Sequence, residues 1–111
     1  MPSRMNPDDA KIIRKVAEQH AYTERVRIEA TPLDGCAEYP GIELPSARTK
    51  WSKIKSLILP DGHGWLDISV HTGNRKNDPT IFLLCLFVGG KLANIYSEWP
   101  TGKMLWPREE V

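Results

Sequence analysis

The hydrophobic pattern of the chain is dominated by one run of nine residues, from Thr80 to Val88, in which eight positions are apolar. The run is far too short to span a bilayer, which takes about 20 apolar residues. Its Phe, Ile and Val residues favour a strand over a short isolated helix. We therefore expect residues 80–88 to form the central strand of a sheet, covered on both faces.

Two further strands are predicted beside this central strand. Residues 65–71 alternate strictly, so that one set of side chains faces the core and the other faces away. After the run, Gly89-Gly90 predicts a tight hairpin turn into a strand within 91–99. Residues 65–99 thus predict a three-stranded antiparallel meander. The expected core set is Leu66, Ile68 and Val70, and the set facing away is Trp65, Asp67, Ser69 and His71.

The N-terminal part predicts a helix followed by a strand. Asn6 is a good N-cap, Pro7 suits the first helical position, and two aspartates follow where the helix dipole favours negative charge. Apolar residues then recur at helical spacing, which predicts a helix over residues 7–20 with its basic residues mostly on the solvent side. Residues 22–30 change to period two and predict a half-buried strand, whose charged outer face is typical of an edge. Its inward set is Val26, Ile28 and Ala30.

Residues 46–59 leave two interpretations open. In the first, Ser46 caps a second helix over 46–58. Its apolar stripe is then Ala47, Trp51, Ile54 and Ile58. In the second, the helix ends near Lys55, and residues 56–59 begin a hairpin that turns through 60–64. The hydrophobic pattern fits both.

Two segments are predicted to be irregular, residues 31–45 and the C-terminal tail 100–111. Prolines at positions 32, 40 and 45 exclude a helix and interrupt any central strand. A structureless connection of this length is often functional. At 111 residues the chain is expected to form a single domain. The predicted fold class is α+β, with an antiparallel sheet of four to five strands and one or two helices packed on one face.

Composition excludes more than it identifies. The formal net charge of +1 gives no overall attraction to nucleic acid or membranes. The N-terminus has no apolar signal segment, and the two cysteines, Cys36 and Cys85, do not make a disulfide scaffold. We expect a cytoplasmic protein with reduced thiols, no membrane contact, no bound metal and no cofactor.

Candidate catalytic residues are few. Asp67, Ser69 and His71 share one face of a predicted strand and carry the groups of a nucleophilic triad. However, alternate residues on a strand lie about 6–7 Å apart, whereas a nucleophile and its base need about 2.6–3.2 Å. We therefore expect no enzyme activity. A small hydrolase or nuclease-like toxin that uses His63 or His71 remains a third hypothesis.

Aromatic residues held by stiff backbone are the first candidates for a protein-binding site. Tyr39 lies between Glu38 and Pro40, and Trp99 and Trp106 each precede a proline. Rigid aromatics lose little entropy when a partner covers them. The alternative is that both tryptophans fold back over the sheet. The predicted protein-binding residues are Glu38, Tyr39, Glu43, Trp99 and Trp106.

The favoured function is therefore the binding of another protein, as an inhibitor, an adaptor or a subunit of a larger complex. A homodimer that buries the second face of the sheet is also possible, with a mass near twice 12.6 kDa. The alternative is a nucleic-acid-binding module, in which a basic helix and the turn before the central strand contact phosphates. Its predicted residues are Arg48, Lys50, Lys53, Lys55, Arg75 and Lys76.

Overall fold

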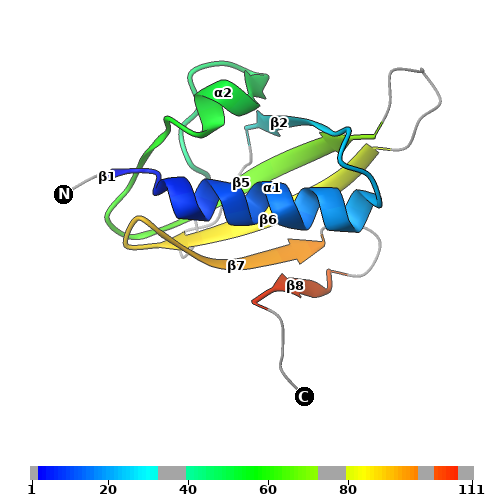
Figure 1. Ribbon diagram of the computed structural model, residues 1–111. Helices are drawn as coiled ribbons and strands as arrows, with labels where there is room; N and C mark the ends of the chain where they lie inside the picture. Colours follow the sequence, from blue (N-terminus) through cyan, green and yellow to red (C-terminus); the bar gives the residue numbers. More distant parts are fainter. Residues whose placement is uncertain (1–2, 33–39, 73–79, 98–101, 108–111) are drawn as a thin grey trace.

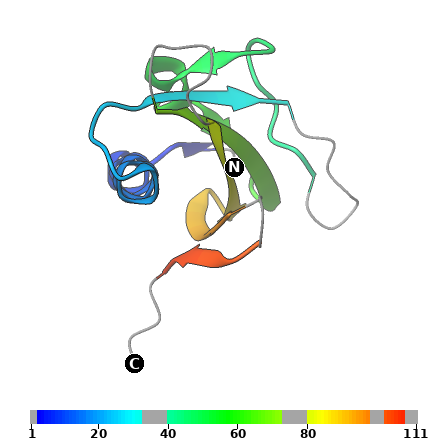
Figure 2. The same ribbon diagram turned by 90° about the vertical axis from the view of Figure 1, so that its right-hand side faces the viewer.

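The computed structural model describes residues 3–32, 40–72, 80–97 and 102–107. It confirms the α+β class: a six-stranded antiparallel sheet in the order β3-β2-β5-β6-β7-β8, a two-stranded sheet β1-β4, and two helices. Helix α1 lies across one face of the large sheet (Figure 1), and the view turned by 90° places it on one side of the curved strands (Figure 2). The elements are β1 Ser3–Arg4, α1 Pro7–Ala21, β2 Arg27–Thr31, β3 Thr49–Lys50, α2 Trp51–Ile54, β4 Ile58–Leu59, β5 His63–His71, β6 Thr80–Val88, β7 Lys91–Ser97 and β8 Met104–Trp106.

Strand β6 is the predicted central strand, with the predicted bounds. It pairs with β5 along its whole length and with β7 on its other side, which confirms the meander. Its side chains towards α1 are buried, with Leu83, Cys85 and Phe87 fully enclosed. The opposite face is covered only in part, because Phe82 is 38% and Val88 is 39% exposed. The prediction that the central strand is covered on both faces therefore holds for the face towards α1 and not for the opposite face.

Helix α1 confirms the predicted first helix. The Asn6 side chain accepts a hydrogen bond of 2.8 Å from the Asp8 backbone N–H, and the helix ends at Tyr22 in the left-handed conformation. The Asp9 carboxylate accepts a hydrogen bond of 3.1 Å from the Leu92 N–H and so joins the helix to β7. The residues that α1 buries against the sheet are Ala10, Ile13, Val16 and Ala17.

Strand β2 is shorter than predicted, although its inward set, Val26, Ile28 and Ala30, is buried as expected. It lies beside β5 and is not the last strand, because the short β3 pairs with it at Glu29 and Ala30. The prediction that this strand forms an edge of the sheet is thus wrong at the two residues where β3 pairs with it.

The long second helix over 46–58 is wrong. Helix α2 contains only Trp51–Ile54, and both Ala47 and Ile58 of the predicted stripe are exposed. The second interpretation is closer, since a strand at Ile58–Leu59 follows the short helix. Its partner is β1, at Ser3 and Arg4, and the predicted hairpin with the next strand does not form. Leu57 and Leu59 are buried on either side of Ile58, so period-two burial replaces helical burial here.

The C-terminal tail is not wholly irregular, because Met104–Trp106 form β8 at the edge of the large sheet. Leu105 and Trp106 pack against the core, and that burial holds the strand in place. In the other segment predicted to be irregular, residues 33–39 lie outside the described residues. Its described end meets β5, with the Ile42 N–H donating to the Trp65 carbonyl at 2.9 Å.

In the part of the chain that the structure describes, neither helix combines the length and the apolar character needed to cross a membrane.

Candidate binding surfaces

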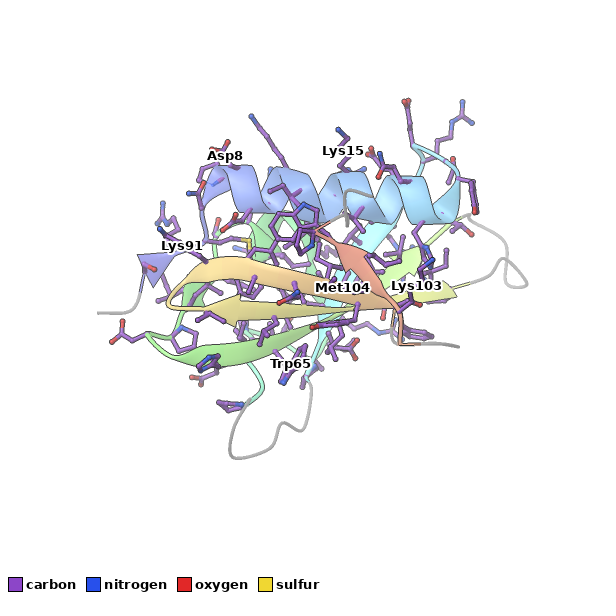
Figure 3. All side chains as sticks on the ribbon, turned by 90° about the horizontal axis from the view of Figure 1, so that it is seen from below. Asp8, Lys15, Trp65, Lys91, Lys103 and Met104 are labelled. Atoms are coloured by element: carbon purple, nitrogen blue, oxygen red, sulfur yellow. The ribbon has the colours of Figure 1, made fainter. Side chains whose placement is uncertain are left out.

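The first candidate surface is the face of the large sheet opposite α1, which we call the open face. Directly paired residues of antiparallel strands share a face, so the registers of β5, β6, β7 and β8 place an apolar set together there. Figure 3 shows Trp65 on the side of the sheet away from α1. The apolar residues of the open face are Trp65, Phe82, Leu84, Leu86, Val88, Tyr96 and Met104.

Contacts between side chains fix the centre of the open face. The rings of Trp65 and Tyr96 lie 5.9 Å apart between centroids, at an interplanar angle of 56°. The Asn94 amide contacts the Met104 sulfur at 3.1 Å. Leu86, which pairs with Trp65 on one side and Asn94 on the other, is 9% exposed. The centre is therefore packed, and the exposed apolar surface lies at Phe82 and Val88 towards the two ends of β6.

A polar group borders the open face on β2 and β5. The Glu29 carboxylate lies 3.4 Å from His71 Nε2 and 3.6 Å from Arg27 Nε. His71 Nδ1 lies 3.4 Å from the Thr80 hydroxyl. The triad considered from the sequence is not assembled, because Asp67 accepts its hydrogen bond from Thr31, at 3.2 Å. Among the described residues, no hydrogen bond joins Asp67, Ser69 and His71 to one another.

The predicted protein-binding residues are not gathered on one surface. Glu38, Tyr39 and Trp99 lie outside the described residues. Glu43 is exposed on the rim of a hollow of about 680 Å³ between residues 40–45 and 56–60. Trp106 is half-buried against the core, as in the alternative that it folds back over the sheet. From the sequence, the open face was considered only as the second face of the sheet that a homodimer would bury, and the alternation of 65–71 had already placed Trp65 on it.

The predicted basic residues are separated as well. Arg75 and Lys76 lie outside the described residues, and Arg48 is exposed. Lys50 lies opposite Glu29 in the register of the β3 and β2 strands. Lys53 lines the hollow beside residues 40–45, whereas Lys55 lines a different groove. A four-residue α2 therefore does not present the cations of 48–55 as one face.

That different groove, which we call the basic groove, lies between α1 and α2 and has a volume of about 770 Å³. The Arg14 guanidinium lies 5.7 Å from the centroid of the Trp51 ring at its wall. Arg14 also forms an ion pair of 3.0 Å with Glu18 and donates to the Val26 carbonyl at 3.3 Å. The groove is lined by Pro7, Ala10, Lys11, Arg14, Lys15, Glu18, Trp51 and Lys55.

Sequence reasoning missed the basic groove, because it assigned the basic residues of the first helix to a solvated face. Lys11, Arg14 and Lys15 have the spacing of neighbours on one helical face, which was the available signal. This spacing does not predict that Trp51 and Lys55 lie opposite the three basic residues of α1. Trp51 and Lys55 are 36 or more positions away from these basic residues in the chain, so only the fold brings them together.

The residue types that commonly bind metals are dispersed over the described residues. The described part of the chain contains no group of three or more His, Cys, Asp or Glu residues placed to hold a metal ion. Burial raises the pKa of the Cys85 thiol well above its ordinary range, and the charge of Asp67 raises it further. A thiol held neutral in this way is a poor nucleophile.

The fold and these surfaces thus define a small α+β domain with two candidate binding surfaces. Comparisons with protein family models, with curated proteins and with solved structures find no match to the chain.

Proposed function

We propose that the protein acts by binding another protein, without chemistry of its own, as an inhibitor, an adaptor or a subunit of a larger complex. The contact surface is the open face. The observation that carries the proposal is the partial exposure of its apolar residues, 38% at Phe82 and 39% at Val88 on the central strand. Burial of apolar surface is the main favourable contribution to protein association.

The composition of the open face supports this function. Trp, Tyr, Phe and Met are enriched in protein interfaces, and the open face contains all four. Trp65 and Tyr96 hold each other in place, so their ordering costs little entropy on binding. The polar border at Arg27, Glu29 and His71 corresponds to the rim of such an interface.

The partner in this proposal is a different protein and not a second copy. Obligate homodimer interfaces are large and strongly apolar. The centre of the open face is already packed, with Leu86 only 9% exposed. What is left for a partner is a modest apolar area beside the polar side chains of Arg27, Glu29 and His71, which favours an exchangeable complex. The proposal includes a cytoplasmic location, in keeping with the expected reduced thiols.

The test is affinity capture from lysate of the source cells, with and without nuclease treatment, with wild type and Phe82→Glu as baits. The proposal expects one protein to be captured by wild type. In calorimetry with the purified pair, its affinity for Phe82→Glu should fall about tenfold or more, because the added charge must be desolvated. Ile58→Glu is the matched control, since Ile58 is 56% exposed but lies on β4 of the two-stranded sheet, outside the large sheet.

A second variant guards against a folding defect. Val88→Glu alters the end of the open face, and circular dichroism of each variant establishes that it is folded. Equal affinity of wild type, folded Phe82→Glu and folded Val88→Glu for the captured protein would rule out the open face. Captured material that disappears with nuclease would instead support the nucleic-acid alternative.

A further inference from the structure

We propose that the basic groove binds an acidic peptide segment of a partner protein, with carboxylates on its lysine rim and an apolar side chain against its wall. This inference rests on the proposed function, because the ligand belongs to a protein, but it uses a different surface from the open face.

Charge supports an acidic ligand. Four cations, Lys11, Arg14, Lys15 and Lys55, line the groove against one carboxylate, that of Glu18. Glu18 is already paired with Arg14 at 3.0 Å. Lys11, Lys15 and Lys55 are exposed, and within the described part of the chain no carboxylate pairs with them. Because the net charge of the whole chain is only +1, the excess is a property of this place in the fold.

The wall of the groove supports an apolar anchor. Pro7 and Trp51 contribute apolar surface between the lysines, whose aliphatic stems add to it. The volume of about 770 Å³ is within the range of clefts that enclose small ligands, about 300–1,000 Å³. A ligand that combines apolar and acidic side chains would match both parts of the groove.

The groove is also preorganised. Arg14 contacts Trp51, Glu18 and the Val26 carbonyl at once, so its guanidinium is held in one position. The contact with the Arg14 guanidinium in turn holds the Trp51 ring beside α1. Side chains that are already ordered lose little entropy when a ligand binds.

The contact between the Arg14 guanidinium and the Trp51 ring favours a peptide ligand over a nucleic acid. Single-stranded nucleic acids bind through bases stacked on exposed aromatic faces along a positively charged track. Here the Arg14 guanidinium already lies over the Trp51 ring. The neighbouring cation Lys53 lines a separate hollow, so among the described residues the lysine rim does not continue along α2.

The test is fluorescence anisotropy of a labelled synthetic peptide in which glutamates surround a central phenylalanine. Lys55→Glu is compared with Lys53→Glu, which makes the same charge change two residues away on the other side of α2. We expect Lys55→Glu and Lys11→Glu each to weaken binding about fivefold or more, and Lys53→Glu to change it less than about twofold. Peptides with glutamine for glutamate, or alanine for phenylalanine, should bind more weakly.

Three outcomes would overturn the inference: no binding of the acidic peptide to wild type, equal loss with Lys53→Glu, or tighter binding of a labelled oligothymidylate that Lys55→Glu abolishes. Phe82→Glu separates this test from that of the proposed function, because it should leave peptide binding unchanged. Peptide binding that fails while capture depends on Phe82 would remove the basic groove alone. Capture that does not depend on Phe82 while the peptide binds would remove the open face alone.

Discussion

Cys85 lies at the middle of the central strand, with Leu66 of β5 on one side of it and Ile95 of β7 on the other. Its side chain is fully buried, and that burial raises the pKa of its thiol, with a further rise from the charge of Asp67. In the unfolded chain the thiol has its ordinary pKa of about 9. The two states therefore bind the Cys85 proton with different affinity, and the stability of the fold must depend on pH where they differ.

The sign of this dependence follows from which state holds the proton. Below about pH 9 both states are protonated, and Cys85 contributes no dependence on pH. Above it, the unfolded chain releases the proton while the native protein keeps it. We expect the free energy of unfolding to fall by about 1.4 kcal/mol per pH unit from this group above pH 9.

Urea unfolding at a series of pH values, for wild type and Cys85→Ala, measures the effect. The variant is less stable below pH 9 because it leaves a cavity, but its stability should fall less steeply above pH 9. Since both chains retain Cys36 and the same lysines and tyrosines, those groups cancel in the comparison. Parallel curves would contradict the assigned burial of the thiol.

At the scale of elements, α1 combines strong local signals with a buried stripe that packs against the sheet. Its cap, its first-turn acids and its buried stripe all agree on the same helix. Helix α2 contrasts with it, since Lys50 at its N-cap position provides no side-chain hydrogen bond and the helix ends after four residues. This difference in local signals explains why the sequence predicted α1 correctly and α2 wrongly.

Asn6 provides the test at this scale. Asn6→Ala removes the hydrogen bond to the Asp8 N–H and should lower the free energy of unfolding by about 1 kcal/mol. Asn6→Ser should retain most of the stability, because a serine hydroxyl can accept the same bond. Urea unfolding of the three chains measures both values. If Asn6→Ala and Asn6→Ser are equally destabilised, the cap is not what Asn6 contributes.

At the scale of the whole molecule, the two candidate surfaces are kept apart by the sheet. The basic groove lies between α1 and α2, whereas the open face lies on the side of the sheet away from α1 (Figures 2 and 3). Occupation of one surface therefore leaves the other accessible. The two proposed sites could then be occupied at the same time, as the proposed role of an adaptor or a subunit requires.

The oligomeric state tests the choice of partner. If the open face serves a different protein, the purified chain should have a mass near 12.6 kDa in light scattering after size exclusion, even at high concentration. A mass near twice that value, which Phe82→Glu returns to 12.6 kDa, would mean that a second copy covers the open face. Ile58→Glu again serves as the control.

The elements that the sequence predicts correctly are those whose signals are local. The apolar run of 80–88 gave β6 its bounds, the alternation after Trp65 identified the core set of β5, and Asn6 and Pro7 placed the start of α1. In each case the period of burial or the chemistry of a cap acts within a few residues. Such signals do not depend on where the rest of the chain lies.

Which segments these elements pack against depends on the tertiary structure. Ile58–Leu59 is a strand because Ser3–Arg4 lies beside it, and Met104–Trp106 is a strand because β7 offers a free edge. Likewise, Trp51 and Lys55 complete the basic groove only because α2 packs beside α1. These outcomes depend on pairings between distant segments, whose free energy comes from burial shared by both partners, so neither segment carries the signal alone.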